Sequence, residues 1–460
     1  MGSIRGASTN RERKGERGVT MALVAVALVV LLAMAALAID VVTLYVASNE
    51  AQRAADASAL AGAKAFVISG FTSGQMGSPT DASVQTRVCQ TAGPGATALG
   101  NQLAQTVATQ NTIAGVPATI QNVTCSFSAS LSDSVPNPQI TVRVQSQNLP
   151  TFFARIWGRR GTVVSATATA EAFNPSGTTV PINVAFMKPW LLPNCNPNTA
   201  PPCAGATLVD PTTYLLNNPS TYIGQSFRFT QASPGAGGPA ARQYYVMELP
   251  PPQAPPNASI CPFVGQINCN EILSGSDPYQ DTIACSTTTL FSCGMAVPSP
   301  PVLIYPYGPT SPNGLGTFAA STQQGIECLI HAGNAGTGQG QDEFGIDGLG
   351  SPITINGGNN NPDSALQNVT NISRSDSIVT VPIYDVTTHS PNLCPSPSGP
   401  CTGSSVIVGF VQLAIQDVGV PTGDAFDAII LNVAGCNPAA AGTPVIGGAV
   451  SPVPTRLIHN

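Results

Sequence analysis

The strongest pattern in this sequence is an unbroken apolar run that follows a basic N-terminal tail. Residues 1–17 contain five Lys and Arg side chains, and the 21 residues from Val19 to Ile39 are uncharged and mostly apolar. A helix over this run is about 30 Å long, which matches the hydrocarbon core of a bilayer. The run therefore predicts a membrane anchor helix, which we place at 18–46.

The charges that flank the apolar run predict its orientation. The next basic residue is Arg53, and positive charge beside a membrane helix stays on the cytoplasmic side. We expect a single pass, a cytoplasmic basic tail over 1–17, and an exported bulk that is periplasmic or at the cell surface. Cleavage after Ala36-Leu37-Ala38 is an alternative, although the run exceeds the roughly 7 to 15 apolar residues of a signal sequence.

Helix-favouring residues continue the pattern beyond the membrane, and many of them are small. Small residues let helices approach closely, so we expect self-association or packing against another anchor. Asp40, Tyr45 and Asp56 are the positions on this helix that we expect to contact other subunits. The alternative for the two aspartates is simple solvation.

Patterns further along the chain predict an α+β fold with two exported parts. Residues 99–110 are amphipathic, while 118–128 and 139–145 alternate β-branched with polar residues. A helical extension, a second helix and an antiparallel sheet would form an α+β domain over 47–173. We expect a second domain over 174–460.

The second domain is expected to be loop-rich and mainly β. The chain contains 45 Gly and 42 Pro and is only 9% charged, which favours turns and irregular loops between short strands. Residues 378–384, 406–416 and 428–433 are apolar and β-branched enough to form buried strands. Loops are expected at 234–242, 250–257 and 332–341.

Two stretches resemble a known family. Residues 17–63, with Ile39-Asp40, Tyr45 and the Ala-Ala-Asp-Ala-Ser-Ala-Leu-Ala-Gly run, resemble the start of TadG/TadE-type proteins of the bacterial tight-adherence (Tad/Flp) pilus system. Residues 150–158 and 164–170 resemble a second segment of that family, and shorter motifs in 174–460 resemble its longer members. The resemblance implies a pilin-like form of the α+β domain over 47–173, an inner-membrane location, a role in pilus assembly, and other pilus-assembly or envelope proteins as partners.

The 12 cysteines all follow the apolar run, which favours disulfides in an oxidising compartment. Their spacing suggests four local pairs, and two further pairs would complete the set. The local pairs are Cys195 with Cys203, Cys261 with Cys269, Cys285 with Cys293, and Cys394 with Cys401; the others are Cys89 with Cys125 and Cys328 with Cys436. Connectivity is not fixed by sequence. Zinc is the alternative, but no CxxC spacing is present.

Little in the sequence predicts catalysis. Its only histidines are His331, His389 and His459, and it has no GxSxG, HExxH or Walker motif. We therefore expect a protein that is not an enzyme and needs no cofactor. Asp342-Glu343 with Asp347 could bind calcium, but a solvated loop is the more common role of such a group.

Charge argues against nucleic acid as a partner. After the tail there remain 12 basic and 21 acidic residues, a net charge of about −9, whereas nucleic-acid binding needs clustered Lys and Arg. The leading hypothesis is a non-catalytic structural or accessory component of a pilus assembly or envelope apparatus. The alternative is a surface-exposed adhesin or ligand-binding protein that uses a signal-anchor.

Overall fold

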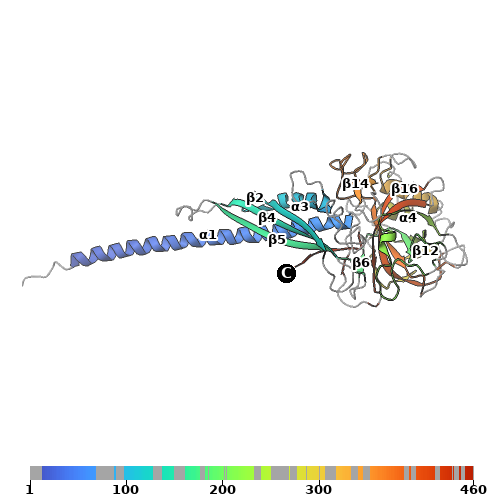
Figure 1. Cartoon of the computed structure of the whole chain (residues 1–460), viewed down its shortest axis with the longest axis horizontal. Coiled ribbons are helices and arrows are strands. Elements are labelled where there is room, and N and C mark those ends of the chain that lie inside the picture. Colours follow the sequence, from blue (N-terminus) through green and yellow to red (C-terminus); the bar gives the residue numbers. More distant parts are fainter. Residues whose placement is uncertain are drawn as a thin grey trace, which may run out of the picture.

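A computed structural model shows a long helix that extends from a globular head (Figure 1). The structure describes residues 13–68, 88–89, 98–127, 137–149, 161–176, 182–184, 186–200, 203, 205–232, 240–249, 269, 277–285, 287, 289–299, 301–305, 318–332, 340–345, 353–387, 393–394, 400–419, 425–437, 439, 445–446 and 451–458. All statements below concern these residues.

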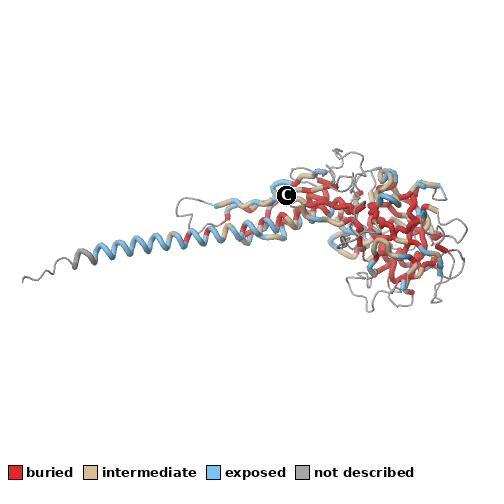
Figure 2. Tube along the Cα trace, turned by 90° about the horizontal axis from the view of Figure 1, so that it is seen from below, coloured by how far each residue is buried: buried red, intermediate tan, exposed pale blue. Residues whose placement is uncertain are grey.

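Helix α1 (Arg13–Ile68) is a single element of 56 residues. Its first half projects away from the rest of the chain, and its second half enters the folded part (Figures 1 and 2). Gly62 lies inside this helix, where its backbone approaches Ile140 of the sheet closely. The predicted membrane anchor and the predicted helical extension are therefore one continuous helix.

A four-stranded antiparallel sheet covers the second half of α1. Its strand order is β19–β5–β4–β3, and α3 packs beside α1 on the same core. The elements are α3 (Leu99–Gln110), β3 (Thr119–Phe127), β4 (Pro138–Leu149), β5 (Thr162–Ala172) and β19 (Thr455–Ile458), with the small hairpin β1 (Thr112–Ile113) and β2 (Val116–Pro117). The helix predicted at 99–110 is present with those bounds. Both predicted strands are also present: the one predicted at 118–128 is slightly shorter, at 119–127, and the one predicted at 139–145 is longer, at 138–149.

The C-terminal strand returns to this sheet. Strand β19 pairs with β5, so everything between Ala172 and Thr455 is inserted between two neighbouring strands of one sheet. One hydrophobic cluster also joins α1 and β4 to Ile378 and Leu431 of the second region. The last strand thus crosses the division expected at residue 173, and the two regions share a core.

The inserted region contains a closed β-barrel of six strands. The ring runs β16–β15–β7–β9–β8–β17 and closes because β17 pairs again with β16. Its strands are β7 (Trp190–Pro193), β8 (Ser226–Gln231), β9 (Gln243–Glu248), β15 (Ile378–Tyr384), β16 (Ser405–Gly419) and β17 (Ala425–Gly435). The apolar runs predicted at 378–384, 406–416 and 428–433 are the three longest strands of this ring, and closure leaves them without free edges.

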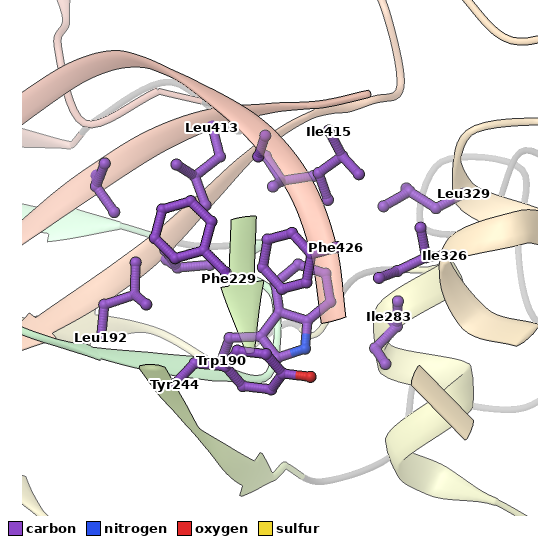
Figure 3. Close-up of a cluster of buried hydrophobic side chains, with 14 of the residues drawn as sticks. Trp190, Leu192, Phe229, Tyr244, Ile283, Ile326, Leu329, Leu413, Ile415 and Phe426 are labelled. Carbon is purple, nitrogen blue, oxygen red and sulfur yellow. The ribbon is translucent and has the colours of Figure 1, made fainter. Parts of the chain in front are cut away.

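Aromatic and branched side chains fill the barrel. Trp190, Phe229, Tyr244 and Phe426 lie together, with the Trp190 and Phe426 ring centroids 4.6 Å apart (Figure 3). Helices α4 (Pro278–Ala284) and α5 (Phe318–Leu329) direct Ile283, Ile326 and Leu329 toward this cluster. The inserted region therefore has a substantial core of its own.

Short elements surround the barrel. Strand β11 (Ala296–Val297) pairs with β16 and β12 (Leu303–Tyr305) with β9. Strands β10 (Phe291–Ser292), β6 (Ile182–Val184) and β18 (Val445–Ile446) form a three-stranded sheet, β13 (Glu343–Gly345) pairs with β14 (Thr354–Asn356), and η2 (Pro219–Thr221) is a 3-10 turn.

The disulfides coincide with the predicted pairs at three places and differ at the others. Cys89 is joined to Cys125, Cys195 to Cys203, and Cys394 to Cys401. The local pairs expected for Cys269 with Cys261 and for Cys285 with Cys293 are wrong, as is Cys328 with Cys436: the structure joins Cys269 to Cys328 and Cys293 to Cys436. Cys285 is disulfide-bonded, and Cys261 lies outside the described residues.

The pairs predicted from the regular spacing of neighbouring cysteines are partly wrong because the fold brings cysteines from distant segments together. Cys328 is on α5, and the end of β17 places Cys436 beside the segment between β10 and β11. The α+β class agrees with the structure in outline, while the closed barrel was not predicted. The motif at 150–158 and the expected loop at 250–257 lie outside the described residues, as do most of 234–242 and 332–341.

Candidate functional site

The first half of α1 exposes an unusual amount of apolar surface. Every residue from Gly18 to Leu32 is exposed, and Met21 and Leu31 are 77% and 66% accessible. Leaving large apolar side chains in water costs roughly 25 cal/mol per Å² of surface. This stretch is long and apolar enough to cross a membrane, and only 6% of its most apolar window is buried within the chain.

The second half of α1 has the opposite character. Its inward face consists of small residues that pack against β4, β5 and α3: Ala47, Ala51, Ala54, Ala55, Ser58, Ala59, Gly62 and Ala63. A Cβ atom added at Gly62 would lie 2.6 Å from Ile140 Cδ1, and one at Gly100 would lie 2.6 Å from the Val88 carbonyl oxygen. The small residues predicted to serve self-association therefore pack within the chain.

The three predicted contact residues do not share one surface. Asp40 is 4% exposed and faces inward, in line with Ala36 and Ala47. Tyr45 is 69% exposed on another side of the helix, and Asp56 is half-buried and accepts a hydrogen bond of 2.7 Å from Gln52 Nε2. Only Tyr45 is therefore available to lipid or to a partner without rearrangement.

The end of α1 is tied to the barrel by a buried amide. Asn432 on β17 is fully buried, and its Nδ2 donates to the Val67 carbonyl oxygen at 2.8 Å and to Gln412 Oε1. Terminal helix carbonyls lack partners within the helix, so this bond satisfies one of them away from water. Neither motif nor spacing marks Asn432 in the sequence.

An ion pair between a half-exposed arginine and a buried carboxylate attaches the C-terminal strand to the sheet. Arg456 on β19 donates to Glu171 Oε1 at 2.6 Å, and its guanidinium lies 3.9 Å from the Phe173 ring centroid. The Glu171 side chain is only 4% exposed. A buried carboxylate requires such a partner, so β19 is fixed in register against β5.

A polar cavity lies far from α1 in sequence, on the 361–376 segment. It has a volume of about 410 Å³ and is lined by Asn361, Pro362, Asp363, Leu366, Arg374, Ser375 and Asp376. Arg374 forms an ion pair with Asp363. The positive charge of Arg374 in the cavity lining is thus balanced by a carboxylate of the same lining.

The acidic group predicted as a solvated loop is partly buried beneath this cavity. The carboxylate of Asp342 accepts hydrogen bonds from Gly358 N–H at 2.9 Å, Asn361 Nδ2 at 3.0 Å and Ser375 Oγ at 2.5 Å. The prediction of a solvated loop is therefore wrong for Asp342, whose carboxylate oxygens hold the surrounding loop segments together by hydrogen bonds. Glu343 is exposed, and Asp347 lies outside the described residues. No group of three metal-ligating side chains occurs within the described ranges.

Lys188 and His331 are buried near Asp376. Lys188 donates to the carbonyl oxygen of Cys285, and burial lowers the pKa of its ammonium to about 7, against the opposing effect of the Asp376 charge. His331 Nε2 lies 3.4 Å from Asp376 Oδ2. His331 is 2% exposed, which suits a structural histidine better than a base that faces a substrate. His389 and His459 lie outside the described residues.

Comparison with known proteins adds one match. A family described as Flp pilus-assembly TadE/G-like matches residues 18–65, which are the exposed half of α1 and most of its packed half. The predicted family resemblance is confirmed for this N-terminal region. Neither a search of curated proteins nor a search of solved structures found a match to the chain.

Proposed function

We propose that this chain is a single-pass, non-catalytic component of a Flp pilus assembly apparatus in a bacterial inner membrane. The observation that carries the proposal is the coincidence of the family match at 18–65 with the structural division of α1. The matched segment is the part of the chain that changes from exposed large apolar residues to buried small ones. It is therefore an anchor joined rigidly to a folded head.

The helix and sheet support a pilin-like arrangement. In this arrangement, a long N-terminal helix has one half free and one half packed on an antiparallel sheet. The free half would hold the head at the membrane, with residues 1–17 cytoplasmic and the head exported. The disulfides support export, because such bonds persist in oxidising compartments.

Partners would meet the chain through surfaces that its own fold leaves open. The small residues of 47–63 are occupied, so contact with other assembly proteins or a second copy would use the exposed apolar half or the head. We propose no catalytic residue and no cofactor. The burial of His331 against Asp376 is consistent with this choice.

Gene deletion with complementation tests the proposal. Surface fibres are counted by electron microscopy, and sheared pilus protein is quantified. Loss of fibres that the intact gene restores supports the role in assembly. A complementing chain whose residues 19–39 are replaced by an unrelated apolar helix is the matched control: restored export without restored fibres would show that this anchor makes specific contacts.

The alternative is an adhesin or ligand-binding protein that uses this anchor. The cavity lined by Arg374 and Asp376 is the observation that favours it. Unchanged fibre numbers with reduced attachment of cells to surfaces would contradict the assembly role and support binding by the head.

A further inference from the structure

The exposed apolar surface of α1 does not stop where the charge-free run stops. Asp40 ends that run in the sequence, but its side chain is 4% exposed and is covered by the chain itself. On the outer side of the helix, Val41, Val42 and Tyr45 remain 57%, 61% and 69% exposed, and Val46 is 48% exposed. The apolar outer surface therefore continues for six residues beyond Asp40.

Polarity on the outer side changes abruptly after Val46. Ser48, Asn49, Gln52 and Arg53 are the next exposed residues. The first charged residue after Asp40 is Glu50, whose carboxylate accepts a hydrogen bond of 2.7 Å from the Ala114 N–H. The outer side of α1 thus becomes polar next to Ala47, the first residue of the buried small-residue face, while the opposite side of the helix is already covered at Ala36 and Asp40.

The exposed apolar part of α1 is longer than the hydrocarbon core of a bilayer and matches the full bilayer thickness, headgroup layers included. The 28 residues from Val19 to Val46 span about 42 Å as a helix, whereas a bilayer measures about 30 Å in its core and about 40 to 45 Å with its headgroup layers. The extra length, with an exposed tyrosine near its end, matches the interfacial layer, where amphipathic aromatic rings are enriched.

From these observations we infer that the outer face of residues 41–46 lies in the interfacial layer of the outer leaflet, so that the head rests directly on lipid headgroups. The partner of this surface is the lipid interface. Asp40 lies at the same depth but faces the chain, so its charge is kept from the acyl region, where a carboxylate is costly. The inference rests on the proposed membrane anchoring and adds the position of the head.

This seating restricts the head more than a free stalk would. Because α1 is continuous through Ala47 and is packed against β4 and β5 from there on, the sheet is held at a fixed depth and tilt relative to the bilayer. Any partner on the membrane would meet the head at one height.

Cysteine labelling of full-length protein in liposomes tests the inference. Single variants Leu31→Cys, Val42→Cys, Tyr45→Cys and Asn49→Cys lie on one side of the helix, and the described part of the chain has no free cysteine. Each variant is treated with a membrane-impermeant maleimide applied on the side of the liposome that carries the head. The labelling rate of each cysteine is divided by the rate for the same variant in detergent, which corrects for differences in intrinsic thiol reactivity. Thiolate, the reactive form, is disfavoured in apolar surroundings.

We expect the cysteines at 42 and 45 to react about tenfold or more slowly than the one at 49, because apolar surroundings disfavour the thiolate, while the one at 31 stays unlabelled. Equal rates at 42, 45 and 49 with no reaction at 31 would overturn the inference and leave the anchoring intact. Rapid reaction at 31 would instead contradict membrane insertion, and with it the proposed function.

Discussion

The two halves of α1 belong to the same helix but differ in the size and exposure of their side chains. From Val19 to Val46 the large exposed side chains are those of Val, Leu, Met, Ile and Tyr, whereas from Ala47 to Ala63 the buried face is Ala, Ser and Gly. Large apolar residues favour contact with lipid, which adapts to any shape. Small residues favour close approach to a fixed protein surface, such as Ile140 of β4.

The difference teaches that residue size, rather than apolar character alone, separates an anchor from a packing surface. Both halves are mostly apolar and helical. A change that matters in one half should therefore be silent in the other. Two predictions test this expectation directly, and two others concern the head and its junction with α1.

Charge in the exposed half should have the largest effect. The double substitution Val24→Asp with Leu28→Asp is expected to cost about 5 to 7 kcal/mol of membrane insertion, at roughly 2.5 to 3.5 kcal/mol per central aspartate. Flotation of reconstituted protein with liposomes measures the loss. The double substitution Ser48→Asp with Asn49→Asp, on exposed positions just beyond Val46, is the matched control, and equal flotation of both variants would contradict the division of α1.

Bulk in the packed half should come next. Gly62→Leu is expected to destabilise the head by about 3 kcal/mol, because the new side chain collides with Ile140 and forces α1 from the sheet. The midpoint of denaturant unfolding of the head measures the change. Gly18→Leu is the control, since nothing lies within 4 Å of a Cβ at Gly18. If both substitutions left the midpoint unchanged, the close packing at Gly62 would be refuted.

The pH dependence of the head should be smaller and independent of α1. Burial lowers the pKa of Lys188 from 10.5, the ordinary value of a lysine, to about 7. Between these two pH values Lys188 is largely neutral in the folded state and charged in the unfolded state, so the folded state binds fewer protons. Stability then rises with pH, by about 2 kcal/mol from pH 7 to pH 9. Unfolding midpoints across this range test it. Lys188→Met should flatten the profile, and flotation with liposomes should not change; a profile equally steep in Lys188→Met would exclude Lys188 as its source.

The junction between α1 and the barrel should give the smallest effect. Asn432→Ala leaves the Val67 carbonyl oxygen buried without this donor and is expected to cost about 1.5 kcal/mol of head stability. Denaturant unfolding measures the loss. Asn437→Ala is the control, because Asn437 lies two residues beyond β17 and its side-chain oxygen accepts an exposed local hydrogen bond from the Ala439 N–H. Backbone amide hydrogen exchange should also become faster in the last turn of α1. Unchanged exchange there would show that the Asn432 bond does not hold the end of α1 against the barrel.

Local features of the sequence were the most predictable. The helix at 99–110 and the strand at 378–384 follow from periodicity and β-branched composition, since these patterns reflect which face is buried. The long N-terminal helix and its family match followed from the apolar run and the residues after it.

Features that depend on distant segments were not predictable in this way. The return of β19 to β5, the closure of the barrel and the bond from Cys293 to Cys436 join positions far apart in the chain. Likewise, the sequence shows Asp40 as a charge but not the direction in which it points, and Lys188 and Asn432 as ordinary polar residues rather than buried ones.

The division of α1 is tested most directly by footprinting the unmodified protein in liposomes with a lipid-soluble carbene reagent. Mass spectrometry then reads the label residue by residue. The account predicts label on all sides of the helix from Val19 to Leu32 and none on the buried small residues from Ala47 to Ala63. Label confined to one side of 19–32, or label on the small residues of 47–63, would contradict it.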